Sequence, residues 1–354
     1  MMKDYCLYRW MRACLGISVF LLAWTSGSVA SAQSVDRRTT ATTTAFSERF
    51  SAEIYGGYLK GQSREVVYNA SNGAKLSELF WSIDNAYLVG LNLAVRPIER
   101  LKLSIGGWMP VTSGNTMDDY DWLATNGFDD WTHWSHSPDT KLNRAYMIDT
   151  RAAFTMTSFK NQPDTAKPWQ IRNASLDMIV GYRWVNLDWT AYGGSYIYTS
   201  EDAAHNVPAA GGSIRDTVGQ FESGKSVISY TQWWGTPYAG IGGSIGINRW
   251  TLSAEVIGSL WAKGRDRDDH HLRTLIFEES FSNVHMVGVN MGIDCNLTEH
   301  LSIFTRFDYQ KFFEGKGSST NTNYETGVSE TNEGDAAGAD FYSMIFSLGL
   351  KLSF

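Results

Sequence analysis

The chain contains two short polar stretches whose side chains could activate a water molecule. The first is DDYDW at residues 118–122, and the second is DRDDHH at residues 266–271. Each follows a run in which apolar and polar residues alternate, which is the pattern of a β-strand with two different faces. We therefore expect two strands to carry these polar stretches to one rim of a barrel, where they would face each other as a catalytic site.

The spacing within each stretch favours acid–base chemistry. Residues two apart on a strand share a face, so Asp119 and Asp121 would point the same way. Asp268 and His270 would do likewise, and Asp268 could fix the tautomer of His270 and favour the imidazolium that forms later. His270 would take a proton from a water that Asp119 holds, with Asp121 behind it. Two carboxylates this close should raise one pKa, so one of them could carry a proton at neutral pH.

Spacing alone leaves other readings open. Asp-x-Asp and Asp-x-His pairs are common, and each also fits a solvated loop or a calcium-type site. Three aspartates and a histidine could hold a divalent metal ion instead. The chain has no HExxH motif and no CxxC pair that would point to a known zinc or redox site.

Composition and patterning indicate a membrane barrel. Aromatic residues make up 14% of the 354-residue chain, and glycines number 33. A strand that faces lipid on one side is apolar only at every second residue, so its mean hydropathy stays moderate. The net charge of −7 argues against nucleic acid as a partner. Ten runs show this alternation: 46–68, 75–95, 101–109, 145–159, 174–198, 226–247, 251–261, 285–295, 303–313 and 346–354.

The last run is the most informative, because apolar residues recur at strict period two and end on a terminal aromatic residue: Phe346, Leu348, Leu350, Leu352 and Phe354. A β structure in lipid must close, since an open edge would leave peptide groups unpaired. The sequence therefore predicts an all-β fold, a ten-stranded antiparallel transmembrane β-barrel that protrudes from the outer membrane. A soluble, secreted β-sandwich or barrel is the alternative.

Polar segments at 112–141, 201–224 and 315–340 are expected to be long loops on the extracellular side. Four tryptophans are expected to form an aromatic belt at the membrane interface: Trp184, Trp189, Trp233 and Trp234.

The N-terminus has the pattern of a secretory signal. Basic residues precede an apolar core at 15–24, which is too short to span a bilayer as a helix, and small residues follow up to Ala32. We predict a cleaved signal peptide over 1–32 and a single barrel domain over 33–354, with an uncleaved N-terminal anchor as the alternative. After cleavage only Cys295 would remain, so no internal disulfide could form.

Several blocks in the same order resemble the omptins, outer-membrane aspartyl/histidine endoproteases of Gram-negative bacteria. They are GQSREVVY at 61–68, DYDW at 119–122, SPDTKLN at 137–143, GGSYIY at 193–198 and DRDDH at 266–270. The resemblance covers nearly the whole chain after the signal segment. It implies a ten-stranded barrel in the outer membrane, with an active site in a groove at its extracellular rim.

The resemblance also implies roles for individual residues. Asp119 and Asp121 match the family's aspartate couple, and Asp268 and His270 match its Asp–His dyad. Glu65 and Asp266 match the acidic floor of the pocket that receives a basic side chain, Arg or Lys, before the scissile bond. Carboxylates suit such a cation, and arginine is favoured because it can bind them bidentately.

The resemblance further implies basic peptide or protein substrates, no metal or other cofactor, lipopolysaccharide as an activating lipid, and a monomer. The chain departs from the family at three positions. His133 stands where relatives carry an acid that selects the residue after the scissile bond, so strict dibasic cleavage is not expected. Asn186 and Trp233 stand where relatives carry basic lipopolysaccharide-binding residues. A non-enzymatic barrel that acts as an adhesin or a narrow pore is the competing hypothesis.

Overall fold

The structure, a computed structural model, describes residues 49–123, 129–161, 169–199 and 214–354. The predicted signal peptide, its cleavage after Ala32 and the first residues of the predicted domain lie outside the described residues. No helix in the described ranges is long and apolar enough to span a membrane.

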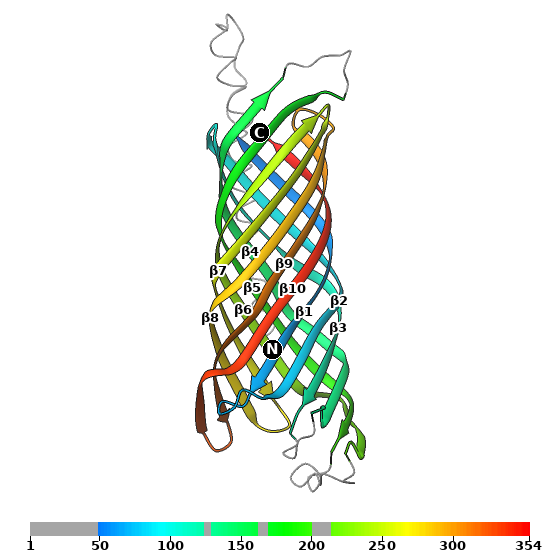
Figure 1. Cartoon of the computed structure of the whole chain (residues 1–354). Helices are drawn as coiled ribbons and strands as arrows, with labels where there is room; N and C mark the ends of the chain where they lie inside the picture. The colour runs from blue at the N-terminus through cyan, green and yellow to red at the C-terminus, as the bar shows by residue number, and fades with distance from the viewer. Residues whose placement is uncertain (1–48, 124–128, 162–168, 200–213) are drawn as a thin grey trace, which may run out of the picture. The chain divides into compact units, whose positions relative to one another are not determined.

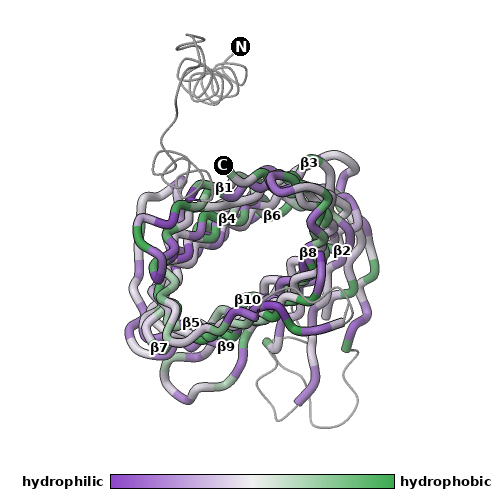
Figure 2. Tube along the Cα trace, turned by 90° about the horizontal axis from the view of Figure 1, so that it is seen from above, coloured by the Kyte–Doolittle hydropathy of each residue, from purple (hydrophilic) through white to green (hydrophobic). Residues whose placement is uncertain are grey.

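Ten antiparallel strands form a closed barrel (Figures 1 and 2). Each strand pairs with the next in sequence, and β1 pairs with β10 from Ser51–Ser353 to Val67–Ala337, which closes the ring. The predicted fold class is therefore confirmed. The strands are β1 (Phe50–Tyr68), β2 (Lys75–Ile98), β3 (Leu101–Asp121), β4 (His133–Lys160), β5 (Ile171–Tyr198), β6 (Thr217–Ile247), β7 (Trp250–His270), β8 (Leu275–Asn296), β9 (Leu301–Asn323) and β10 (Val328–Ser353).

An apolar belt covers part of the outer face. The five alternating residues at the end of the chain, from Phe346 to Phe354, all face outward and are between 44% and 59% exposed. The rim-side edge of the belt is marked by exposed Tyr58, Val111, Trp261 and Phe313. We take the strands below this edge as the membrane-spanning segments, because only there does the outer face stay apolar at every second residue.

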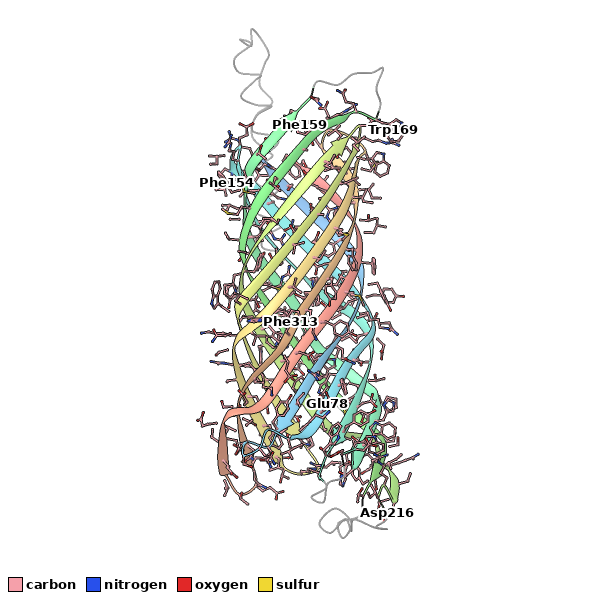
Figure 3. The ribbon with its side chains drawn as sticks, in the orientation of Figure 1. Glu78, Phe154, Phe159, Trp169, Asp216 and Phe313 are labelled. Carbon is pink, nitrogen blue, oxygen red and sulfur yellow. The ribbon has the colours of Figure 1, made fainter. Side chains whose placement is uncertain are left out.

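The barrel has two different ends. Figure 3 shows Phe154, Phe159 and Trp169 towards one end of the barrel, the end that carries the C-terminus in Figure 1, and Glu78 and Asp216 towards the opposite end. The strands are 19 residues (β1) to 31 residues (β6) long, whereas about 9–11 residues cross a bilayer. The barrel therefore extends well past the belt, and the candidate site lies on this extension.

Strands extend into all three of the predicted long loops, so that prediction is wrong in its boundaries; residues 201–213 of the second lie outside the described residues. β3 continues to Asp121 and β4 begins at His133. β6 begins at Thr217, and the hairpin of β9 and β10 occupies most of 315–340. Above the belt both faces of the sheet can meet water, so a strand can continue there without apolar alternation. The polar residues that suggested loops lie on the part of the sheet that extends beyond the belt.

A buried polar network fills the lumen at the level of the belt. Arg183 donates from Nε to Asp149 Oδ2 (2.8 Å) and from Nη1 to Gln310 Oε1 (2.9 Å). The Tyr238 hydroxyl donates to Asp149 Oδ1 at 2.7 Å. These contacts satisfy charges that would otherwise be costly to bury.

An aromatic layer lies between this network and the rim. Trp81 stacks on Tyr230 with ring centroids 5.4 Å apart, and Trp189 lies 6.0 Å from Trp81. Trp234 stacks on Phe312 at 4.7 Å. All five side chains are fully buried, so the layer forms a rigid base beneath the candidate site.

Two of the four predicted belt tryptophans belong to this layer instead. Trp189 and Trp234 are fully buried inside the barrel, so their assignment to the interface is wrong. Trp184 is 38% exposed and does face outward. The reason is strand geometry, since residues separated by an odd number of positions point to opposite faces.

Candidate active site

The end of β3 carries the two aspartates of the first polar stretch. Asp119 and Asp121 are both buried, at 5% and 7% exposure. Ser77 on the neighbouring β2 donates its hydroxyl to Asp119 Oδ1 at 3.3 Å. Burial, reinforced by the neighbouring charge of Asp121, raises the pKa of Asp119 to about 8. At neutral pH this couple therefore holds a proton, as the spacing predicted.

The end of β7 carries the Asp–His dyad. His270 Nε2 lies 2.6 Å from Asp268 Oδ2, and Asp268 is only 1% exposed. Burial lowers the pKa of His270, but the neighbouring Asp268 carboxylate outweighs it, so that pKa rises above its ordinary value. His271 points to the other face, where its Nε2 contacts the Ser229 hydroxyl at 2.8 Å. The predicted hydrogen bond within the dyad is thus present.

The couple and the dyad face each other across the rim. Arg273, in the turn after β7, brings its Nη2 within 4.0 Å of Asp121 Oδ2. The charge of Asp119 contributes to the raised pKa of His270, and His270 in turn counteracts the rise in the pKa of Asp119. The closed ring therefore brings the two polar stretches to one place, although they are far apart in sequence.

Below the dyad lies a cluster of three buried acids, Glu65 on β1, Asp266 on β7 and Glu279 on β8, which we call the acidic pocket after the pocket that the family resemblance implies. Their exposures are 1%, 3% and 2%. Asp266 and Glu279 are direct partners in the β7–β8 register. The charges of Asp266 and Glu279 also contribute to the raised pKa of Glu65, which places all three carboxylates close together.

A hydrogen-bonded chain positions one side of this pocket. The Tyr230 hydroxyl donates to Asp266 Oδ2 at 2.9 Å, and Gln232 Nε2 donates to the Tyr230 hydroxyl at 3.0 Å. Ser63 and the Trp234 indole both donate to Gln232 Oε1, at 2.7 and 2.9 Å. The aromatic layer therefore fixes Asp266 directly.

The acids of this pocket have no cationic partner among the described residues. Within the described ranges, Glu65 Oε2, Asp266 Oδ1 and both carboxylate oxygens of Glu279 have no hydrogen-bond partner of ordinary geometry. Burial raises the pKa of Asp266 to about 7, and burial together with the neighbouring acids raises the pKa of Glu65 and Glu279 well above its ordinary value. Buried anions are normally paired, so this pocket lacks a cation.

All six site residues predicted from the sequence lie at this rim. A seventh, Glu279, was not among the predicted residues. Without the strand register, the adjacent acids Glu278 and Glu279 resemble two solvent-exposed residues of a loop. Counting back from the β7–β8 turn would have revealed it, because that register places Glu279 opposite Asp266.

The three departures also have defined surroundings. His133 is the register partner of Asp121, and its ring lies 4.9 Å from that of Tyr198. Burial lowers its pKa, so it carries no charge at neutral pH. Asn186 is 1% exposed and pairs in register with Trp233, and neither residue offers a charge to a lipid headgroup.

Among the residues that the structure describes, no group of three or more histidine, cysteine, aspartate and glutamate side chains is arranged to hold a metal ion.

Comparisons with known proteins agree with one another. The sequence model described as "Omptin family" matches residues 46–354. The chain is 31% identical over 310 residues to the plasminogen activator of Yersinia pestis, covering 87% of this chain and 90% of that protein. It is 28% identical to protease 7 of Escherichia coli K12, covering 87% and 91%. The crystal structure of the outer-membrane protease OmpT from Escherichia coli matches with a TM-score of 0.77 and 26% identity, covering 87% and 97%.

Proposed function

The chain belongs to the omptin family of outer-membrane proteases, and we propose that it hydrolyses peptide bonds that follow an arginine or a lysine. The activity resides in the extracellular rim of the barrel. Asp119, Asp121, Asp268 and His270 are the catalytic residues of this proposal.

The observation that carries the proposed specificity is the unpaired acidic pocket. Glu65, Asp266 and Glu279 are buried, and within the described ranges no lysine, arginine or histidine pairs with them. A basic side chain of the substrate would supply the missing charge and donate hydrogen bonds to the orphaned oxygens. Arginine suits the pocket best because its five N–H donors form a rigid fork that binds carboxylates bidentately.

The mechanism follows from the two facing pairs. A water molecule lies between Asp119 and His270, and the neutral His270 ring takes its proton as the water oxygen attacks the peptide carbonyl carbon. Asp268 stabilises the resulting imidazolium. His270 then passes the proton to the departing amine nitrogen as the C–N bond breaks. The proton held by the couple prevents Asp119 and Asp121 from placing two negative charges beside the developing oxyanion.

Internally quenched peptides test this proposal. The full chain, refolded in detergent with lipopolysaccharide, should cleave a peptide with one arginine and should not cleave the same peptide with citrulline, its uncharged isostere. His270→Ala should abolish the cleavage. A chelator should leave it unchanged, whereas metal-dependent hydrolysis would lose activity.

A folded wild-type barrel that cleaves neither peptide would favour the competing hypothesis of an adhesin. That hypothesis predicts that surface binding survives in His270→Ala.

We also propose that the protein is a monomer with lipopolysaccharide as an activating lipid, and that its dependence on this lipid is weak. The support is local: Asn186 is buried and uncharged, and Trp233 lies beside it. Measuring cleavage with and without lipopolysaccharide, alongside the molar mass of the detergent complex by light scattering, tests both statements.

A further inference from the structure

A cavity opens at the rim, formed by the outer ends of β5 and β6 and by the turn after β7. Its volume is about 410 Å³, within the range of roughly 300–1,000 Å³ that is usual for ligand pockets. Its apolar wall consists of Tyr196, Tyr198, Phe221, Val227 and Leu272. We call it the rim pocket.

The rim pocket is continuous with the catalytic couple through the sheet. Asp119 pairs in register with Ser135, Ser135 with Tyr196, and Tyr196 with Gly219. Residues directly opposite each other on paired strands share a face, so Tyr196 lies on the same inner face as Asp119. Asp119 and Asp121 both contribute to the pKa of Tyr198, which burial raises to about 12. The rim pocket therefore adjoins the aspartate couple.

The other side of the pocket adjoins the dyad. Ile228 pairs in register with His270, and the His271 N–H donates to the carbonyl oxygen of Val227 at 3.0 Å. Leu272 follows two residues after His270. A peptide bound between the couple and the dyad would thus pass directly over the mouth of the pocket.

Strand order places the rim pocket on the opposite side of the scissile bond from the acidic pocket. The couple lies on β3 and the dyad on β7, which divide the ring into two arcs. The acidic pocket uses β1 and β8, on the arc that runs from β8 through β10 and β1 to β2. The rim pocket uses β5 and β6, on the other arc. If the residue before the scissile bond enters the acidic pocket, the residue after it faces the rim pocket.

The lining favours an uncharged side chain. Tyr196 stacks on Tyr198 with centroids 4.6 Å apart and packs against Phe221 at 5.0 Å. The charged lining residues, Glu222 and Lys225, are mostly exposed and lie 4.0 Å from each other, so their charges offset at the mouth.

A backbone irregularity maintains this arrangement. The register of β5 shifts between Tyr192 and Gly194. Gly194 has φ of 110°, and an added Cβ would collide with the carbonyl oxygen of His136. Glycine therefore allows the bulge after which the Tyr196 ring packs against Phe221.

We propose that the rim pocket binds the side chain of the residue directly after the scissile bond and selects a large apolar or aromatic one. The inference rests on the proposed function, because the acidic pocket defines which side of the bond the rim pocket serves. The preferred substrates are thus segments in which a basic residue is followed by a bulky apolar residue, rather than by a second basic one.

The test uses the refolded full chain and peptides that share one arginine and differ only in the next residue. Phenylalanine after the arginine should give about tenfold higher kcat/KM than alanine, and lysine should be poorer still. Phe221→Glu should remove the preference for phenylalanine and favour lysine. Leu272→Glu, in the exposed turn after β7, should act in the same direction. Val218→Glu is the matched control, because Val218 lies on the opposite face of the same strand and is 74% exposed.

The outcomes separate the two proposals. Equal cleavage of the phenylalanine and alanine peptides by the wild type would overturn the rim-pocket assignment and leave the arginine specificity intact. So would a preference that Val218→Glu changes as much as Phe221→Glu does. Failure to distinguish arginine from citrulline would overturn the proposed function, and with it the assignment of sides.

Discussion

Replacing Glu279 with glutamine would remove one charge from the acidic pocket while preserving the shape of the side chain. The free protein and the substrate complex should respond in opposite directions. In the free protein, Glu279 is a buried carboxylate beside Asp266, Glu65 and Ser319, and no cation pairs with it in the described ranges. In the proposed complex, it would contact the basic side chain of the substrate.

The two magnitudes follow from these surroundings. Leaving a buried polar or charged group unsatisfied costs about 1–3 kcal/mol, and glutamine removes the negative charge but stays polar, so Glu279→Gln should raise the free energy of unfolding by no more than that amount. A hydrogen bond to a charged group contributes about 1.5–3 kcal/mol. Its loss should raise KM for an arginine peptide by roughly 10- to 150-fold, with kcat little changed, because the contact is made equally in the ground state and the transition state.

The free energy of unfolding should also depend on pH in a defined direction. Burial raises the pKa of Asp266 to about 7, so the folded protein binds protons that the unfolded chain releases. The free energy of unfolding should therefore be highest below the ordinary carboxyl pKa and fall as the pH rises towards about 7. Glu279→Gln should reduce this fall, since it removes a carboxyl group whose own pKa is raised well above its ordinary value in the folded protein.

The assay combines urea unfolding in detergent micelles at several pH values with steady-state cleavage of arginine peptides. Glu278→Gln is the matched control. Glu278 is the preceding residue, its side chain is 56% exposed, and it forms a surface ion pair with Arg267 at 3.0 Å. Such pairs contribute about 0–1 kcal/mol, so neither KM nor stability should change much. A Glu279→Gln protein with wild-type KM, or one less stable than the wild type, would refute the reasoning.

Three further predictions concern the catalytic pairs and the lumen. Asp268→Asn should favour the wrong tautomer of His270 and lower kcat by roughly 10,000-fold, measured on folded protein with an arginine peptide. The rate should rise with pH as His270 loses its proton, above the ordinary histidine value, and fall beyond about pH 8, where the couple loses the proton assigned to Asp119; a rate that stays constant above that pH would contradict the role given to the shared proton. Arg183→Ala should lower the free energy of unfolding by about 1.5–3 kcal/mol, because Asp149 would keep only Arg151 and the Tyr238 hydroxyl as partners and would lose a charged hydrogen bond; an unchanged urea midpoint would show that this bond contributes little.

Much of the fold could be predicted because lipid imposes a strict period. The alternation that ends at Phe354 has one physical cause, an outer face in hydrocarbon, and the structure shows those residues facing outward. Prediction was wrong where that cause no longer acts. Above the belt both faces can meet water, so the strand ends at Asp121 and Asn323 leave no apolar signature, and their polar composition resembles a loop.

Some residues of the site could also be predicted from local spacing, and others could not. Asp268 and His270 lie on one strand, and a spacing of two is enough to place them on one face. Glu279 becomes visible only when β8 is aligned against β7, which sequence spacing does not provide. Trp189 was misassigned by residue type, although its odd separation from the outward-facing Trp184 places it inside the barrel.

The side chains inside the lumen affect where the products of proteolysis are released. Arg183, Asp149 and Gln310 occupy the interior at membrane level, and the aromatic layer lies between them and the site. The lumen is thus occupied by side chains at membrane level. Peptide fragments made at the rim would therefore be released on the extracellular side, and the producing cell would need separate transporters to take them up.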